Sequence, residues 1–193
     1  MTWLVAGLGN PGDRYSKTRH NLGAMVVDEL VGGAGERLRK VRFLPAEIAE
    51  IRESGTPVIL ARSLRFMNES GPAYASLARK RGIEPSDVIA VHDELDLAPG
   101  SLQVRLGGGT AGHNGLRSLQ QALGSPEFHR VRIGIGRPPG RQDPADFVLE
   151  PIPKRIESDL EILVGEAADA VRCLIAEGLP AAQDRFNRKG SGV

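Results

Sequence analysis

The sequence has few of the features that mark secreted or membrane proteins. It contains one cysteine, Cys173, and so cannot form a disulfide within the chain. It has no run of about 18 apolar residues, which excludes a transmembrane helix. The first residues show no basic segment followed by a long apolar one, so we expect no secretory signal. Together these absences favour a cytoplasmic protein.

The common signatures of metal and covalent catalysis are also missing. The four histidines show no paired H-x-x-x-H spacing, and Cys173 lies among the apolar residues of a predicted helix. No G-x-S-x-G sequence occurs, so a serine nucleophile on a strand-to-helix turn is not supported. We therefore expect neither a metal site nor a covalent nucleophile. What remains is a histidine acting as a general base toward water.

A glycine-rich start raises one alternative class, the dinucleotide-dependent oxidoreductases. The sequence GLGNPG at 7–12 satisfies G-x-G-x-x-G. In that fingerprint a helix opens at the glycines, so that its N-terminus meets the pyrophosphate. Here the next eight residues, DRYSKTRH, lack an apolar helical stripe, and no second strand ending in an acid follows at the expected distance. This alternative is therefore disfavoured, and a cofactor titration would test it.

The composition is typical of a globular protein, and we expect residues 1–193 to form a single domain. Apolar residues make up 40% of the chain and charged residues 25%, which suits a buried core under a polar surface. Short runs typical of strands alternate with segments of helical spacing. The pattern predicts an α/β fold, with a mixed, mostly parallel sheet flanked by helices on both faces. We expect strands at 3–7, 46–53, 58–61, 88–91, 102–106 and 131–135, and helices from 22, from near 68 and through 116–123.

The last third of the chain is predicted to be helical. Apolar residues from Ile156 to Ile175 form one long amphipathic stripe. We expect this segment, about 153–188, to pack on the rest of the domain. Because no second broad apolar stripe is left uncovered, we expect a monomer.

Charge is balanced over the whole chain, with a net charge of +1, but it is unevenly distributed. From Gly100 to Arg141 there is one acid, Glu127, against six basic residues: Arg105, Arg117, Arg130, Arg132, Arg137 and Arg141. From Asp143 to Asp169 eight acids face two basic residues. A basic segment of this kind is what a polyanion partner requires, although a solvated arginine-rich face is the simpler alternative.

Several polar residues come directly after the predicted strands. Asn10 comes after the strand at 3–7, Asn68 after that at 58–61, and Asp93 after that at 88–91. His20 precedes the first helix, and His113 and Asn114 precede a later one. Ligands of open α/β sheets usually lie beyond the carboxyl ends of the strands, where these side chains would meet. Taken one at a time, the asparagines also fit helix caps or turns.

Seven blocks of the sequence, in order, resemble the bacterial peptidyl-tRNA hydrolase family. They are GLGNPG at 7–12, Y-x-x-TRHN-x-G at 15–23, FMNESG at 66–71, HDELDL at 92–97, GGGTAGHNGLRS at 107–118, FHRVRIGIGRP at 128–138 and DPADFVLE at 143–150. The blocks cover the chain from about residue 3 to 150. Where the family commonly has Lys-Pro-x-Thr before FMN, this chain reads RSLR at 62–65. That departure affects the expected wall of the site and none of the expected catalytic residues.

The resemblance implies a role for each matching residue. His20 would be the general base that activates water, and Asp93 would orient its imidazole. The remaining site residues would bind substrate, and they are Asn10, Tyr15, Met67, Asn68, His113 and Asn114. Three arginines, Arg105, Arg132 and Arg137, are the expected contacts to tRNA phosphates.

The substrate implied by the resemblance is peptidyl-tRNA, cleaved at its ester bond without a metal or organic cofactor. An activated ester of this kind needs only a base, a water molecule and a site for the oxyanion. The strongest rival interpretation is a nucleic-acid-binding protein of the same fold that performs no hydrolysis. The presence of both His20 and Asp93 argues against it, because a binding protein has no need for a base.

Overall fold

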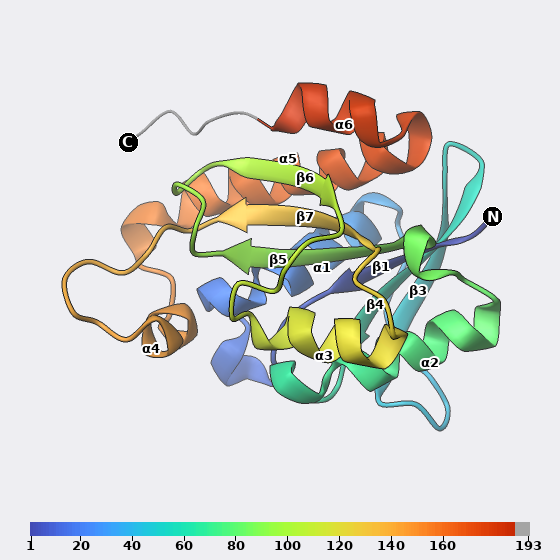
Figure 1. Ribbon diagram of the computed structural model, residues 1–193, viewed down its shortest axis with the longest axis horizontal. Coiled ribbons are helices and arrows are strands. Elements are labelled where there is room, and N and C mark those ends of the chain that lie inside the picture. Colours follow the sequence, from blue (N-terminus) through green and yellow to red (C-terminus); the bar gives the residue numbers. More distant parts are fainter. Residues whose placement is uncertain (188–193) are drawn as a thin grey trace.

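A seven-stranded sheet forms the centre of the molecule in the computed structural model, which describes residues 1–187 (Figure 1). The strands are β1 (Trp3–Gly7), β2 (Arg39–Lys40), β3 (Ala46–Glu53), β4 (Thr56–Ser63), β5 (Val88–Glu94), β6 (Leu102–Leu106) and β7 (His129–Gly134). The α-helices are α1 (Leu22–Gly33), α2 (Gly71–Arg81), α3 (Asn114–Leu123), α4 (Pro144–Leu149), α5 (Lys154–Glu177) and α6 (Leu179–Phe186). Single 3-10 turns are η1 (Asp13–Tyr15), η2 (Arg19–Asn21), η3 (Met67–Glu69) and η4 (Pro85–Asp87).

The sheet is mixed, as predicted, with strand order β2-β3-β4-β1-β5-β7-β6. The four central strands, β4, β1, β5 and β7, run parallel. The outer pairings, β2–β3, β3–β4 and β6–β7, are antiparallel. In Figure 1 the arrows of β5 and β7 accordingly point one way and that of β6 the other. The carboxyl ends of β4, β1 and β5 therefore meet at one edge of the sheet.

Helices cover both faces of the sheet, which confirms the predicted α/β architecture. One apolar core lies between the sheet and α1 and α5, and a second lies between the sheet and α2 and α3 (Figure 1). Along β1, Trp3 and Val5 enter the first core, whereas Leu4 and Ala6 enter the second. Because successive strand residues point to opposite faces, a strand buried on both sides reads as a continuous apolar run. This is why WLVAG at 3–7 was recognisable from sequence.

The start of α1 lies in close backbone contact with the carboxyl ends of β1 and β5. A Cβ added at Gly23 would overlap the carbonyl oxygen of Val91 and lie 2.7 Å from the backbone nitrogen of Leu8. The backbone N–H of Ala24 donates to the carbonyl oxygen of Leu8 at 3.1 Å. Only glycine permits this approach. It joins the start of α1 to the loop after β1.

The predicted helix near Asn68 begins later than expected, at Gly71, because residues 67–69 form the separate turn η3. Two contacts hold that turn in place. The backbone N–H of Met67 donates to Oδ1 of Asn10, and the Ser70 hydroxyl donates to the carbonyl oxygen of Met67, both at 2.8 Å. The first contact spans 57 residues of sequence, so no local pattern reveals it. Pro72 lies in the first turn of α2, as predicted.

The predicted C-terminal helical segment is α5 and α6, and its expected last residue, 188, lies outside the described residues. The first core joins α5 to α1, and α6 runs beside the outer strand β6. Asn187 pairs with this strand, since its side chain accepts from the N–H of Val104 at 2.6 Å and donates to its carbonyl oxygen at 3.1 Å. Some of the backbone groups on the outer side of β6 thereby gain hydrogen-bond partners. None of the helices within residues 1–187 is long and apolar enough to cross a membrane.

Candidate active site

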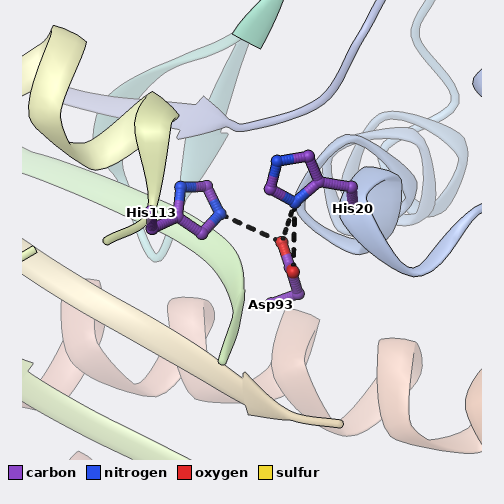
Figure 2. Close-up of side chains that lie close together, drawn as sticks. All are labelled: His20, Asp93 and His113. Atoms are coloured by element: carbon purple, nitrogen blue, oxygen red, sulfur yellow. Dashed lines mark hydrogen bonds and ion pairs between the residues drawn. The ribbon is translucent and has the colours of Figure 1, made fainter. Parts of the chain in front are cut away.

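His20 and Asp93 form a hydrogen-bonded pair at the carboxyl edge of the sheet (Figure 2). Asp93 lies near the end of β5, and His20 lies in η2, just before α1. Nδ1 of His20 is 3.0 Å from Oδ1 and 3.1 Å from Oδ2 of Asp93. Their side chains are 11% and 2% exposed. Two residues separated by 73 positions in sequence are thus brought into contact, as expected from the sequence.

The Asp93 carboxyl is ionised in this setting. Burial by itself raises the pKa of Asp93, but the neighbouring imidazoles of His20 and His113 lower it by more than burial raises it. The net effect holds the pKa of Asp93 well below its usual range. An ionised carboxylate only accepts hydrogen bonds, so Nδ1 of His20 carries the proton that joins the pair. The other ring nitrogen of His20 points away from Asp93, as Figure 2 shows, and makes no hydrogen bond within residues 1–187, so it can accept a proton.

A cleft of about 580 Å³ opens over His20. Five of the predicted substrate residues line it together with His20, namely Asn10, Tyr15, Met67, Asn68 and Asn114. They come from the loop after β1, from η1, from η3 and from the first residue of α3. The structure therefore brings to one cavity Asn10, Asn68 and Asn114, which the sheet-edge argument selected, and Tyr15 and Met67, which the family resemblance added.

His113, the sixth predicted substrate residue, does not line this cleft. Its side chain is 8% exposed, and its Nε2 lies 3.0 Å from Oδ1 of Asp93 (Figure 2). The expectation that it contacts substrate is therefore not supported by the geometry. The physical reason is that the His113 ring caps the start of α3 and contacts Asp93 of β5, whereas the next side chain, Asn114, lines the cleft.

Asn10 has its amide orientation set by the surrounding backbone. Its backbone N–H donates to Oδ1 of Asn21, and Nδ2 of Asn21 donates back to the Asn10 carbonyl oxygen, both at 2.9 Å. Its own Oδ1 accepts from the N–H of Met67. Because this oxygen is held by Met67, the amide NH2 group of Asn10 (Nδ2) is the group available to the cleft. Asn21 is buried, and sequence reasoning missed its role although it lies in the recognised TRHN block.

The alternative that Asn68 and Asn114 are helix caps is wrong. The N-cap of α2 is Ser70, and the N-cap of α3 is His113. Both asparagines line the cleft. They add hydrogen-bonding capacity to the cleft without adding charge.

One wall of the cleft comes from α4, which sequence reasoning did not assign. Ala145, Val148 and Leu149 line the cleft from this helix. The buried Arg19 connects α4 to the turn that carries His20, because its guanidinium donates to the carbonyl oxygen of Phe147 at 3.3 Å and lies 4.1 Å from the centre of the Phe147 ring. A proline after an aspartate at 143–144 is a helix-start signal, so the helix was predictable, but its docking was not.

The three predicted phosphate contacts differ in what they offer. Arg137 is 63% exposed and pairs with Asp96. Arg132 is only 14% exposed and is engaged by Glu94 at 2.8 Å and by Gln103, so its charge is largely neutralised within the fold. Arg105 is partly buried and packs against Gly108 in the glycine-rich loop.

A buried arginine that sequence reasoning treated only as part of the basic field has a structural role. Arg130 is 2% exposed, and its guanidinium donates to the carbonyl oxygens of Gly108 and Gly109. These contacts hold the loop that leads into His113 and Asn114. The signal was weak, because an arginine in an alternating strand reads equally well as a surface residue.

Donor atoms of His20, Asp93 and His113 lie within 4.8 Å of one another, close enough to hold a metal ion. In the structure the Asp93 carboxylate is hydrogen-bonded to both histidines. The three side chains are therefore already engaged in hydrogen bonds with one another through Asp93. The site combines a histidine with one free ring nitrogen, a buried counter-charge and a cleft rich in uncharged donors, which together suit the hydrolysis of an ester by activated water.

Comparison with known proteins gives a consistent result. Residues 4–192 match the family model described as "Peptidyl-tRNA hydrolase". The peptidyl-tRNA hydrolase of Cutibacterium acnes is 51% identical over 196 residues, covering 96% of this chain and 98% of the relative. That of Mycolicibacterium smegmatis is 50% identical over 181 residues, covering 94% and 95%. The crystal structure of peptidyl-tRNA hydrolase from Acinetobacter baumannii superposes with a TM-score of 0.90 at 33% identity, covering 97% of this chain and 95% of that one.

Proposed function

The chain belongs to the peptidyl-tRNA hydrolase family, and we propose that His20 and Asp93 are the general base and its orienting carboxylate. The chain is a hydrolase that acts on the ester bond of peptidyl-tRNA. The observation that carries the proposal is the 3.0 Å contact between Nδ1 of His20 and Asp93, made beneath a cleft that the same histidine lines.

The reaction needs one proton to be moved twice. The free ring nitrogen of His20 takes a proton from water as the water oxygen attacks the ester carbonyl carbon. The resulting tetrahedral intermediate carries its negative charge on the former carbonyl oxygen. Its collapse breaks the bond to the ribose oxygen at the 3′ end of the tRNA, and the imidazolium returns the proton to that oxygen. Asp93 stabilises the imidazolium between these two steps.

The amides of the cleft supply the donors that this intermediate requires. Nδ2 of Asn10 is the best-oriented candidate, because its partner oxygen is held by the N–H of Met67. Asn68 and Asn114 lie in the same cleft and would hold the peptide backbone. A carboxylate in any of these positions would repel both the oxyanion and the RNA phosphates. Tyr15 and Met67 would add apolar contact to the substrate.

The RNA portion is expected to lie along the arginine-rich strands. Arg105 and Arg137 would contact phosphates directly, and Arg132 would contribute less, since Glu94 pairs with it and offsets its charge. We also propose that residues 1–193 act as one monomeric domain in the cytoplasm, where translation produces the substrate.

The test is release of free tRNA from an N-acetyl-aminoacyl-tRNA. An unblocked aminoacyl-tRNA serves as the control substrate, and His20→Ala as the control for the base. We expect cleavage of the blocked ester and a loss of activity in folded His20→Ala, as judged by circular dichroism. A folded wild type that binds tRNA without cleaving it would contradict the hydrolase assignment, and a fully active His20→Ala would contradict the assigned base.

A further inference from the structure

His113 makes contacts through both of its ring nitrogens. Nδ1 caps α3, accepting from the backbone N–H groups of Gly115 at 3.2 Å and Leu116 at 3.3 Å. Nε2 lies 3.0 Å from Oδ1 of Asp93 (Figure 2). The ring therefore connects the first turn of a helix to the carboxylate behind the base.

These contacts determine where the His113 proton lies. A ring nitrogen that accepts two N–H groups cannot carry a proton itself, so Nδ1 is bare and the proton is on Nε2. Nε2–H then donates to the Asp93 carboxylate. An imidazolium at this position would direct its Nδ1–H against two backbone N–H groups, at the positive end of a helix. His113 is thus a neutral ring with one tautomer.

We infer that His113 is a positioning residue for hydrolysis, which fixes Asp93 in the orientation that receives Nδ1–H of His20. The inference rests on the proposed function of His20. It assigns His113 to the support of the base and not to the binding of substrate. One oxygen, Oδ1 of Asp93, lies 3.0 Å from both rings, so His113 holds an oxygen that His20 also contacts.

A second buried histidine completes the arrangement. Nδ1 of His92 lies 2.7 Å from the backbone carbonyl oxygen of Asp93, to which it donates, and its ring meets that of His113 edge-on at 5.0 Å. Burial lowers the pKa of His92 well below its ordinary value. His92 therefore stays neutral, and both ring nitrogens of His113 are already engaged by hydrogen bonds. The proton removed from water has one destination, His20, whose ring faces the cleft.

The same tautomer opposes metal binding by His20, Asp93 and His113. A metal ion needs the lone pair of Nε2 of His113, which would transfer the proton to Nδ1. The N–H groups of Gly115 and Leu116 would then lose their acceptor and face another N–H group. The residues that could hold an ion are thus arranged for hydrogen bonding instead.

A matched pair of substitutions separates the two contacts of His113. The amide oxygen of asparagine can take the place of Nδ1, so His113→Asn keeps the helix cap and loses the donor to Asp93. The longer glutamine places its amide nitrogen near the position of Nε2, so His113→Gln keeps the donor and loses the cap. We expect His113→Asn to lower kcat roughly ten- to hundredfold, as for the loss of a hydrogen bond to a charged group. We expect His113→Gln to retain kcat within about threefold at the cost of a lower melting temperature.

Two kinetic outcomes would overturn the inference. A rise in KM in both variants with kcat unchanged would make His113 a substrate-binding residue. An active His113→Asn beside an inactive but folded His113→Gln would leave it only the role of a helix cap.

The tautomers are measured directly by NMR with ¹⁵N-labelled histidine, from the one- and two-bond couplings of the ring protons. We expect the His113 proton on Nε2 and the His20 proton on Nδ1 in the wild type at neutral pH. A His113 ring protonated on Nδ1, or on both nitrogens, would refute the inference. Because this readout does not depend on turnover, a wild type that failed to hydrolyse peptidyl-tRNA would defeat the proposed function while the tautomer of His113 was still measured.

Discussion

Replacing Asp93 with asparagine removes one charge while keeping the shape of the side chain. Both of its neighbours present an N–H group to it, His113 through Nε2 and His20 through Nδ1. An amide has only one oxygen to offer them. If that oxygen stays at the Oδ1 position, the amide NH2 takes the Oδ2 position, 3.1 Å from Nδ1 of His20. Two donors then face each other, and His20 relieves the clash by shifting its proton to Nε2, the nitrogen that is proposed to accept one from water.

The size of the effect is set by this change of tautomer and by the lost counter-charge. The corresponding aspartate-to-asparagine change in a serine protease triad lowers kcat by about 10⁴-fold. We expect Asp93→Asn to lower kcat by about 10³- to 10⁴-fold, which corresponds to about 4–5.5 kcal/mol of barrier. KM should stay within about threefold, because Asp93 is 2% exposed and does not line the cleft.

The assay is single-turnover release of tRNA from N-acetyl-aminoacyl-tRNA at saturating enzyme. Urea denaturation of each variant checks that the fold persists. Asp169→Asn is the matched control, since this carboxylate is 64% exposed on α5 and pairs with Arg172 on the same helix. A loss of less than tenfold in folded Asp93→Asn, or a loss expressed only in KM, would refute the reasoning.

Three further predictions concern binding, packing and pH. Asn10→Asp should raise KM at least about tenfold at nearly unchanged melting temperature, because the carboxylate loses the amide donor and repels the substrate; equal Michaelis parameters would contradict this. Gly23→Ala should destabilise the fold by about 1–3 kcal/mol, since the added Cβ overlaps the Val91 carbonyl oxygen. Gly32→Ala in the same helix, whose Cβ meets nothing within 4 Å, should instead stabilise by about 0.5–1 kcal/mol in denaturation curves. Burial depresses the pKa of His92, so the unfolded chain binds this proton first and native stability should fall by up to about 1.4 kcal/mol per pH unit below about pH 6.5. His92→Gln should show a shallower acid dependence of its urea midpoint, and identical slopes would contradict the assignment.

Much of the site could be predicted because its residues come directly after strands that local patterns reveal. The runs at 3–7 and 88–91 are continuously apolar, and parallel strands bring the residues at their carboxyl ends to one edge of the sheet. That argument predicted that Asn10, Asn68 and Asp93 lie close together. In the structure Asn10 and Asn68 line the cleft, and Asp93 lies beneath it in contact with His20. The family resemblance then singled out His20 from the other histidines as the proposed base.

Contacts across long stretches of sequence could not be predicted in the same way. Three features of the site depend on which side chains meet after folding. They are the contact of His113 with Asp93, the ion pair of Arg132 with Glu94 and the hydrogen bonds between Asn10 and Asn21. Periodicity reports whether a residue is buried, but it does not identify the partner that buries it. The interpretation of Asn68 as a helix cap was wrong for the same reason. The turn at 67–69 is held by Asn10, which lies 57 positions away in the sequence.

The sequence by itself determined the α/β class, the strands that form the sheet edge and, through its family resemblance, the chemistry expected there. Local propensity and alternation are properties of neighbouring residues, and these features need nothing more. Only the tertiary structure decided the roles of the three histidines around Asp93. Each role is set by hydrogen bonds: His20 is left with one nitrogen toward the cleft, His113 is held by the start of α3, and His92 is bound to the backbone of β5. A proton's position depends on the donors and acceptors within about 3 Å of it, and those are assembled only when the chain has folded.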